Sequence, residues 1–271
     1  MRARKRFGQH FLEAPWVDRV IAAADPRPTD VFLEIGPGRG ALTIPLARRV
    51  SEVIAVELDR DLAAELSRRA PANARVVQAD ALEVDLGGLF RGSASSLRRR
   101  IIGNLPYNVS TPILARLLHA GGGGLIHDAT LMVQREVADR LAAEPGGGEY
   151  GVLSILTRAQ ADVERLLDLP PGAFRPVPRI RSTLVRLTFG PQRVPPALAV
   201  PFNSLVRSVF TQRRKVLANA LKPLATGAGV SVPALLMAAA LDGRRRPETL
   251  QLAEFVRLAE VFASADRLPV L

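Results

Sequence analysis

VFLEIGPGRG, residues 31–40, is the part of this 271-residue chain from which its fold class follows. Residues 31–35 are an apolar run of the length of a buried strand, and glycines follow at positions 36, 38 and 40. Residues 41–50 then have the pattern of a helix. A buried strand, a glycine-rich turn and a helix predict the first unit of an open parallel α/β sheet, with the turn close to a ligand.

Three more strands are predicted, and each of the four runs into a residue suited to a polar ligand. These residues are Gly36, Glu57, Asp80 and Asn104, after strands at residues 31–35, 53–56, 75–79 and 100–103. Because the carboxyl ends of parallel strands line one crevice, we expect them to converge. Glu57, 17 residues beyond Gly40, is placed to accept the ribose hydroxyls of a nucleoside. Taken alone, Glu57 is also explained as a solvated carboxylate and Asp80 as a helix cap. The occurrence of a suitable residue at the end of all four strands favours a binding site.

The tetrapeptide Asn104-Leu105-Pro106-Tyr107 indicates the chemistry at this crevice. An amino group conjugated to a purine ring is a poor nucleophile because its lone pair is delocalised into the ring. The Asn104 side-chain oxygen and the Leu105 carbonyl can each accept one amine hydrogen, while Tyr107 stacks on the base. Pro106 keeps that backbone rigid. The same residue types are common in ordinary strand-to-helix turns, but their place in the crevice favours amine chemistry over a plain turn.

A nicotinamide dinucleotide is the main alternative ligand for such a glycine turn. Residues 36–40 have the spacing Gly-x-Gly-x-Gly, whereas the dinucleotide fingerprint requires Gly-x-Gly-x-x-Gly. Residues 104–107 have no role in hydride transfer. A nucleoside that carries a reactive methyl sulfonium therefore fits the combined pattern better.

Further motifs occur in order along nearly the whole chain. They are residues 4–12 (RKRFGQHFL), 57–59 (ELD), 80–81 (DA), 104–108 (NLPYN), 134–137 (QREV), 150–151 (YG), 174–178 (FRPVP) and 212–215 (QRRK). With these motifs the chain resembles the ribosomal RNA adenine dimethyltransferases, most closely the bacterial enzymes that dimethylate two adjacent adenines near the 3′ end of 16S rRNA in the small ribosomal subunit. The resemblance implies an α/β fold, a Rossmann-like S-adenosylmethionine-dependent methyltransferase sheet with a small all-helical C-terminal domain.

The resemblance also implies site residues. The cofactor-binding residues would be His10, Leu12, Gly36, Gly38, Glu57, Asp80 and Asn104, and the catalytic residues Asn104, Leu105, Pro106, Tyr107 and Phe174. By the same resemblance Glu57 holds the ribose of S-adenosylmethionine and Asp80 its adenine. Residues 10–12 cover its methionine end, and Tyr107 and Phe174 sandwich the target base.

Some positions depart from the commonest pattern of these enzymes. His10 stands where many relatives have Asn, and Val216 replaces a frequent Thr. Residues 179–181 (RIR) replace a more usual Lys-Val-Asp. None of these departures removes a catalytic part, but the last one changes the residues expected to contact RNA there.

A Pro-rich stretch at residues 190–196 marks the expected domain boundary. We expect residues 1–190 to form the S-adenosylmethionine-binding catalytic domain and residues 191–271 a helical RNA-binding domain. Apolar residues recur at intervals of three and four along residues 202–210 and 252–262. This periodicity predicts two amphipathic helices in the second domain.

Two more local structures are predicted in the first domain. Residues 184–189 alternate weakly and are expected to pair with residues 163–169 as an antiparallel hairpin that closes the sheet. The arginine run at residues 98–100 follows a stretch rich in Ser and Gly. Such a charge run is typical of a solvated loop.

The charge balance calls for a polyanionic partner. The formal net charge is +11 and the sequence pI is near 11.3, which favours nucleic acid. Arginine supplies 34 of the 37 basic residues, so an isolated Arg says little about binding. The cluster Arg213, Arg214 and Lys215 is the preferred RNA-binding candidate, since it lies beside Gln212, is expected to open a helix and matches a family motif.

Composition also excludes several classes of site. The chain has no cysteine, which excludes disulfides and thiolate metal sites, and its three histidines are too scattered to suggest a metal. No apolar run approaches the ~18 residues of a membrane span. The basic N-terminal segment lacks the apolar core of a signal peptide. We therefore expect a cytoplasmic, monomeric protein without a metal.

Two other functions stay open at this point. One is an enzyme of the same fold that acts on large-subunit rRNA, as the macrolide-resistance methyltransferases do, or on DNA. Leu105 argues mildly against DNA adenine enzymes, which tend to have Pro there. The other is a non-catalytic ribosome assembly factor that only clamps RNA. The intact set of cofactor residues argues against a pure clamp, because a clamp needs no cofactor.

Overall fold

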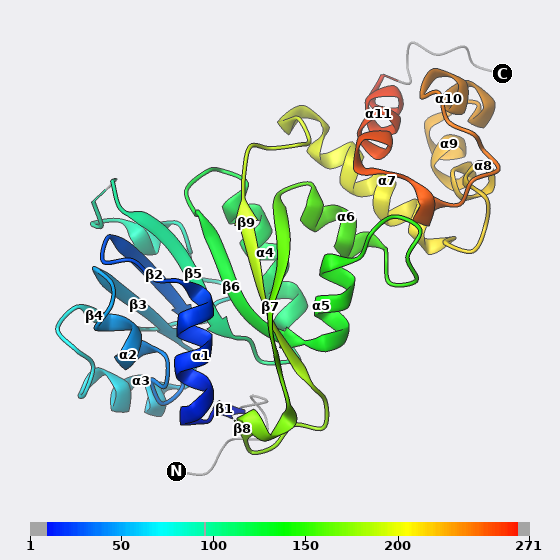
Figure 1. Cartoon of the computed structure of the whole chain (residues 1–271). Helices are drawn as coiled ribbons and strands as arrows, with labels where there is room; N and C mark the ends of the chain where they lie inside the picture. Colours follow the sequence, from blue (N-terminus) through cyan, green and yellow to red (C-terminus); the bar gives the residue numbers. More distant parts are fainter. Residues whose placement is uncertain (1–9, 95, 265–271) are drawn as a thin grey trace. The chain divides into compact units, whose positions relative to one another are not determined.

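The computed structural model describes residues 10–94 and 96–264 of the chain (Figure 1). These residues fall into two compact units. The first comprises the described parts of residues 1–138 and 161–191, and the second those of residues 139–160 and 192–271. The chain therefore contributes two separate segments to the second unit. Residues 139–160 belong to the same unit as the C-terminal helices. The boundary expected near residue 190 had assigned them to the catalytic domain.

A seven-stranded mixed sheet forms the centre of the first unit. In spatial order its strands are β4 (Ala74–Gln78), β3 (Glu52–Glu57), β2 (Asp30–Ile35), β5 (Arg98–Asn104), β6 (Asp128–Gln134), β9 (Ser182–Phe189) and β7 (Ala161–Leu169). The first five of these strands are parallel, and β9 is antiparallel to both of its neighbours. All six residues of β2 are buried, as expected for a parallel strand covered on both faces. The predicted closing hairpin is confirmed by the pairing of β7 with β9.

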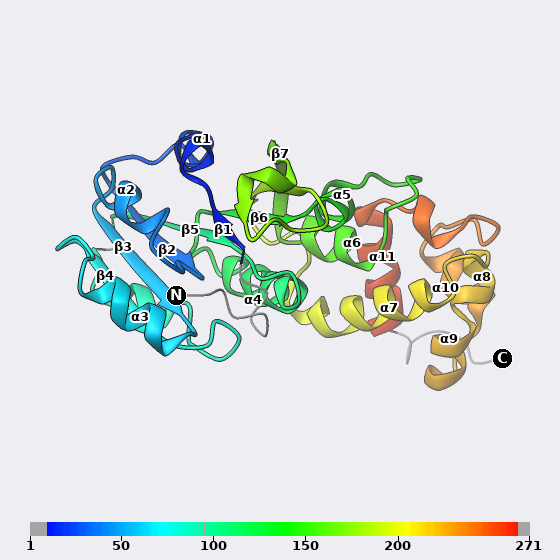
Figure 2. The same cartoon turned by 90° about the horizontal axis from the view of Figure 1, so that it is seen from below.

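Helices cover both faces of this sheet (Figures 1 and 2). They are α1 (Ala14–Ala24), α2 (Thr43–Ala47), α3 (Arg60–Ser67), α4 (Ser110–Gly121) and the first half of α5 (Arg135–Ala142). On one face, Ile21 of α1 and Leu46 of α2 pack with Phe32 and Ile102 of the sheet in one apolar core. Helix α3 lies beside α2, with Leu66 next to Gly40 and Ile44, and α4 covers the opposite face (Figure 2). The helix predicted over residues 41–50 is shorter than expected, since only the five residues of α2 are helical.

A separate two-stranded sheet lies beside the N-terminal end of the described chain. It pairs β1 (Phe11–Leu12) with β8 (Phe174–Arg175), and Leu12 lies opposite Phe174. This long-range pairing brings the segment before α1 to the segment that follows β7. It thereby places His10 next to the main sheet's carboxyl edge.

Helices make up the second unit. They are the second half of α5, α6 (Val152–Arg158), α7 (Ala199–Thr211), α8 (Leu217–Ala220), α9 (Lys222–Ala228), α10 (Val232–Ala238) and α11 (Leu252–Ala263). Helices α7 and α11 confirm the two helices predicted from periodicity. Tyr150 is fully buried among them, and its hydroxyl donates to the Leu250 carbonyl at 3.0 Å. That bond ties the two segments of this unit together.

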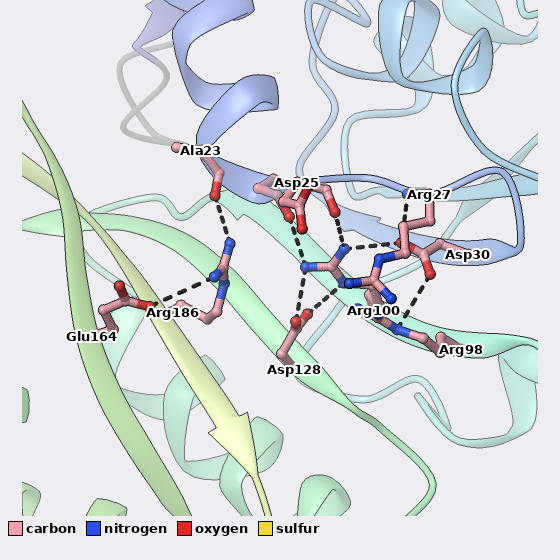
Figure 3. Close-up of polar contacts among 10 residues, drawn as sticks. Ala23, Asp25, Arg27, Asp30, Arg98, Arg100, Asp128, Glu164 and Arg186 are labelled. Atoms are coloured by element: carbon pink, nitrogen blue, oxygen red, sulfur yellow. Dashed lines mark hydrogen bonds and ion pairs between the residues drawn. The ribbon is translucent and has the colours of Figure 1, made fainter.

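The arginine run at residues 98–100 is not a solvated loop, so that prediction is wrong. These residues begin β5, and Arg100 is only 1% exposed. Its guanidinium lies between Asp30 of β2 and Asp128 of β6, at 2.9 and 2.8 Å (Figure 3). The negative partners are far away in sequence, and they compensate the charge of the buried arginine.

No described helix is long and apolar enough to cross a membrane.

Candidate active site

One pocket opens at the carboxyl ends of the parallel strands of the first unit. Its lining includes ten expected site residues, and also Asn108 of the same motif: His10, Leu12, Gly36, Gly38, Glu57, Asp80, Asn104, Leu105, Pro106 and Tyr107. The pocket thus brings together every expected cofactor residue and four of the five expected catalytic residues. Phe174 is not part of this lining.

The glycine turn lets the backbone form the wall of this pocket. Gly36 and Gly38 have φ angles of +69° and +56°, a conformation that costs residues with a Cβ free energy. At Gly38 a Cβ would also lie 2.9 Å from the Phe11 ring. The turn therefore requires glycine at both positions, and it leaves main-chain atoms facing the pocket.

Glu57, the last residue of β3, is buried beside the turn. One carboxylate oxygen accepts the Gly38 N–H at 2.9 Å and the other accepts the Asp59 N–H, also at 2.9 Å. Burial raises the pKa of Glu57, and these two main-chain hydrogen bonds oppose the rise. Since a carboxylate oxygen has two lone pairs, each oxygen keeps one lone pair for a ligand hydroxyl.

Asp80 follows β4, and its two carboxylate oxygens differ in their hydrogen bonds. Its Oδ1 accepts the Leu82 N–H at 2.8 Å, which caps the turn that follows. Its Oδ2 accepts no hydrogen bond from any described residue. The helix-cap interpretation of Asp80 and the ligand interpretation are therefore compatible, because they use different oxygens.

Asn104 ends β5, and its carboxamide orientation is set by one hydrogen bond. The Asn104 Nδ2 donates to the His10 carbonyl at 2.7 Å. This bond directs the other half of the amide, Oδ1, away from His10, and Oδ1 accepts nothing from the described residues. The group that faces the pocket as an acceptor is thus the oxygen, as the amine-binding hypothesis requires.

Tyr107 is fixed from two sides. Its hydroxyl is 2.7 Å from the Ser182 Oγ, and its ring stacks on the His10 ring with centroids 5.4 Å apart and an interplanar angle of 27°. Burial raises the pKa of Tyr107 and the Ser182 hydrogen bond opposes the rise, so the phenol is neutral near pH 7. Sequence reasoning missed both contacts. Ser182 carries no local signal, since it meets Tyr107 only through the pairing of β9 with β6.

Phe174 lies outside the lining of the pocket that contains Tyr107. Its ring is 0% exposed and belongs to the apolar core that also contains Leu12 and Ala173. An aromatic side chain in this position stabilises the β1–β8 pair but offers no face to a base. The structure therefore does not assemble the expected sandwich of Tyr107 and Phe174. His10 is the aromatic residue that contacts Tyr107 instead.

A second buried carboxyl lies in this pocket's lining and was missed. Glu34 of β2 is 2% exposed, and its Oε2 accepts the Thr43 hydroxyl of α2 at 2.5 Å. Burial raises the pKa of Glu34 from 4.5 to about 7, the Thr43 hydrogen bond opposes the rise, and the nearby charge of Glu57 adds to it. A signal existed in the sequence, because an acid within a fully apolar strand run is unusual.

The raised pKa of Glu34 predicts a pH-dependent stability of the first unit. The folded state holds this proton more tightly than the unfolded state, so its contribution is complete below pH 4.5 and is lost as the pH rises through about 7. The loss is on the order of 3 kcal/mol. Glu34→Gln should abolish it, because glutamine is neutral throughout. The measurement is urea unfolding at pH 5 and pH 8, followed by fluorescence of Trp16, the only tryptophan, which packs on the core of this unit.

Glu65→Gln is the control for that comparison, since Glu65 lies on α3 of the same unit and is partly exposed. It should retain the wild-type difference between the two pH values. Equal pH dependence in the wild type and in Glu34→Gln would contradict the assignment.

The RNA-binding candidates of the second unit do not behave alike. Residues 212–215 lie in the turn between α7 and α8, not at the start of a helix. The Arg213 guanidinium donates to the carbonyls of Gly147 and Gly148, at 3.4 and 2.5 Å. Arg213 thus holds the two segments of the second unit together. Arg214 and Lys215 are exposed.

The family is decided by a match along almost the entire chain. The family model described as ribosomal RNA adenine dimethylase matches residues 1–259. The chain belongs to the ribosomal RNA adenine dimethylase family. It is accordingly a methyltransferase that uses S-adenosylmethionine as methyl donor.

Curated relatives of this dimethylase share its full length. The ribosomal RNA small subunit methyltransferase A of Methylibium petroleiphilum is 44% identical over 267 residues, with 98% of each chain covered. The protein of the same name from Nitrosococcus oceani is 45% identical over 270 residues, again with 98% of each covered.

Solved structures share its fold. A dimethyladenosine transferase from Plasmodium falciparum superposes with a TM-score of 0.77 at 22% identity, over 96% of this chain and 99% of the other. The 23S rRNA methyltransferase ErmE superposes with a TM-score of 0.65 at 26% identity, over 95% and 100%. The expected α/β methyltransferase fold is confirmed.

The pocket of this dimethylase fits S-adenosylmethionine. Glu57 offers two oxygens with spare lone pairs, Asp80 offers one free oxygen, and Gly36 and Gly38 of the turn are part of the lining. The rest of the lining is largely apolar, which suits the adenine ring and the methionine chain.

Proposed function

We propose that the protein transfers methyl groups from S-adenosylmethionine to the exocyclic amines of two adjacent adenines near the 3′ end of 16S rRNA in the small ribosomal subunit, giving dimethyladenosines. The observation that carries the proposal is the free Asn104 Oδ1 beside Tyr107, in the same pocket as Glu57. An amine acceptor, a base-stacking ring and a nucleoside site in one pocket suit transfer to a base. The names of the relatives at 44% and 45% identity support the small subunit as substrate.

In this proposal the residues position the amine and leave the bond-making to the substrates. When bound, S-adenosylmethionine supplies an electrophilic methyl group on its sulfonium. Asn104 Oδ1 and the Leu105 carbonyl accept the two amine hydrogens, so the nitrogen lone pair is directed toward the methyl group. A carboxamide oxygen is too weak a base to remove a proton, and the role of Asn104 is therefore orientation. Pro106 holds the Leu105 carbonyl in place.

Glu57 is proposed to bind the ribose, which gives a first prediction for the cofactor. Glu57→Ala should weaken S-adenosylmethionine binding by about 1.5–3 kcal/mol, the range for hydrogen bonds to a charged group. Calorimetric titration measures the change. Trp16 fluorescence and circular dichroism serve as fold controls, because Glu57 also accepts the Gly38 N–H. Unchanged affinity in a folded variant would remove Glu57 from the site.

The second unit is proposed to bind rRNA through Arg214 and Lys215, with the catalytic residues confined to the first unit. The double variant Arg214→Ala/Lys215→Ala should flatten the log-log salt dependence of RNA binding by about 1.4–1.8, at 0.7–0.9 per phosphate contact. Cofactor affinity should not change. Arg213 is left intact, because it holds main-chain carbonyls.

A matched control is Arg244→Ala/Arg246→Ala, which removes the same charge from the same unit. These arginines are paired with Asp242 and Glu248, so their loss should alter the slope less. A wild-type slope in Arg214→Ala/Lys215→Ala would place the RNA contacts elsewhere.

The central test is to map the methylated positions. Purified protein and S-adenosylmethionine are incubated with unmethylated small and large ribosomal subunits, and the RNA is analysed by mass spectrometry. The proposal expects dimethyladenosine at two adjacent positions near the 3′ end of the small-subunit RNA. Methylation confined to the large subunit would favour the macrolide-resistance type of activity. Cofactor binding without any transfer would favour an assembly factor.

The proposed setting is the cytoplasm, where ribosomal subunits are the substrate. A monomer is also proposed. Sedimentation of the purified protein, alone and with subunits, measures the oligomeric state.

A further inference from the structure

Residues 175–181, named here the rim segment, expose apolar and cationic side chains together. Val177 and Ile180 are 54% and 43% exposed. They are two of the five large hydrophobic side chains that are exposed among the described residues. Arg175, Arg179 and Arg181 on the same segment are also exposed. Apolar side chains interleaved with arginines are unusual for a surface that meets only water.

Hydrogen bonds attach the rim segment to the active site at both ends. At one end, the Pro176 carbonyl lies 2.6 Å from the His10 Nδ1, and His10 stacks on Tyr107. At the other end, Ser182 follows the segment directly and its Oγ is 2.7 Å from the Tyr107 hydroxyl. The rim segment is therefore connected, through His10 and Ser182, to the residue whose ring is proposed to stack on the target base.

The charges of the rim segment are available to a ligand. Arg179 and Arg181 form no ion pair with any residue of the described chain, and Arg175 donates only to the main-chain carbonyls of Gly172 and Phe174. Unpaired arginines complement phosphates. Exposed aliphatic side chains between them fit the apolar face of a base. The combination selects RNA over a small anion or an acidic peptide, because a nucleic acid offers both phosphates and the apolar faces of bases.

We infer that the rim segment binds the substrate RNA around the target adenine, with Arg179 and Arg181 on phosphates and with Ile180 and Val177 filling the space that the adenine leaves in its stack. The inference rests on the proposed function. Extruding a base costs unstacking free energy, and apolar side chains that enter a base step offset part of that cost. The rim segment thus favours the extruded state of the adenine. Through Ser182 and His10, it holds Tyr107 where the base arrives.

Substitution of the apolar residues and substitution of the arginines of the rim segment should change different measured quantities. In Val177→Ser/Ile180→Ser, single-turnover methylation of unmethylated small ribosomal subunits, at saturating subunits and S-adenosylmethionine, should slow about tenfold. The salt slope of subunit binding should stay at the wild-type value. In Arg179→Ala/Arg181→Ala, the slope should flatten by about 1.4–1.8. The rate at saturation should then stay within about threefold of the wild type.

Val200→Ser/Met237→Ser is the matched control, because both side chains are exposed and apolar but lie in the second unit. It should methylate at the wild-type rate. S-adenosylmethionine affinity and Trp16-detected unfolding are measured for every variant. A loss of either in Val177→Ser/Ile180→Ser would mean a structural role and overturn the inference.

The remaining outcomes separate the inference from the proposed function. If the wild type transfers no methyl group to adenine in the subunits, the proposed function fails and the inference fails with it. If the wild type is active and Val177→Ser/Ile180→Ser is equally fast at saturation, the apolar residues do not support base extrusion. The proposed function then stands and the inference is overturned.

Discussion

Asn104→Ala is expected to slow single-turnover methyl transfer by at least ~10²-fold, by analogy with the removal of one preorganised polar group from an active site. The Asn104 Nδ2 is held by the His10 carbonyl at 2.7 Å, so Oδ1 is fixed before the base arrives. Alanine removes the acceptor and also releases His10. The measurement is made at saturating S-adenosylmethionine, which separates a slower transfer from weaker cofactor binding.

Two companion variants sharpen the Asn104 experiment. Asn203→Ala is the control, since Asn203 also donates Nδ2 to a main-chain carbonyl, that of Ala199, but lies exposed on α7. It should leave the rate unchanged. Tyr107→Ala should impair the step that requires the extruded base, so its defect should be greatest where base capture limits the rate. Near wild-type rates for both Asn104→Ala and Tyr107→Ala would exclude the proposed mechanism.

The convergence of the site could be predicted because it follows from topology. Parallel strands present their carboxyl ends at one edge, so Gly36, Glu57, Asp80 and Asn104 had to meet once four strands were recognised. The structure orders these strands as β4, β3, β2 and β5, and all four residues line one pocket. Local pattern was sufficient here, because each strand and its terminal residue are adjacent in sequence.

Contacts between distant segments could not be predicted in this way. Phe174 is buried because β8 pairs with β1, more than 160 positions earlier in the chain, as in the pair of Leu12 with Phe174. Tyr150 lies in the second unit, within its apolar core, and its hydroxyl donates to the Leu250 carbonyl, 100 residues later. A short window contains neither partner. The motif that includes Phe174 was recognised, but its packing was not.

Arg213 illustrates a different limit. Its cluster is basic and lies in a family motif. Sequence offers no stronger indication of phosphate binding than these two features together. The carbonyls of Gly147 and Gly148 nevertheless engage its guanidinium. Sequence gives the charge of a side chain, whereas its availability depends on the acceptors that the fold brings near. Only Arg214 and Lys215 remain as exposed members of the cluster.

Arg100 carries the largest stability prediction, because the fold surrounds it completely with acceptors. Its Nε donates to Asp128, its Nη1 to Asp30 and the Asp25 carbonyl, and its Nη2 to Asp128 and the Ala24 carbonyl, all within 2.7–2.9 Å (Figure 3). These five bonds use all five N–H donors of a guanidinium. Burial opposes the charge of Arg100, but Asp128 and then Asp30 outweigh it, so the pKa of Arg100 lies above its ordinary value.

The network joins the end of α1 to the amino ends of β2, β5 and β6. The pocket lies at the opposite, carboxyl ends of the strands. Arg100→Leu leaves Asp128 buried without its counter-charge, leaves Asp30 with only the longer Arg98 ion pair at 3.4 Å, and leaves two helix-end carbonyls without a donor. We expect it to lower the free energy of unfolding of the first unit by about 3–5 kcal/mol, the cost of breaking a buried ion pair by removing one partner. Trp16 on α1 reports the transition in urea. Below that transition, cofactor affinity should be close to the wild-type value, because the pocket lies at the other edge.

Charge neutralisation separates this explanation from simple loss of packing. Arg100→Leu/Asp30→Asn/Asp128→Asn removes the uncompensated charges and should recover part of the stability lost in Arg100→Leu, although the cavity and the unpaired carbonyls remain. Arg91→Ala is the surface control, since Arg91 and Asp85 form an ion pair of 2.6 Å but are 80% and 66% exposed, and it should cost far less stability than Arg100→Leu. If Arg100→Leu cost no more than Arg91→Ala, the buried network would contribute nothing to the stability of the sheet. If the triple variant were no more stable than Arg100→Leu, packing and not charge would be the contribution of Arg100.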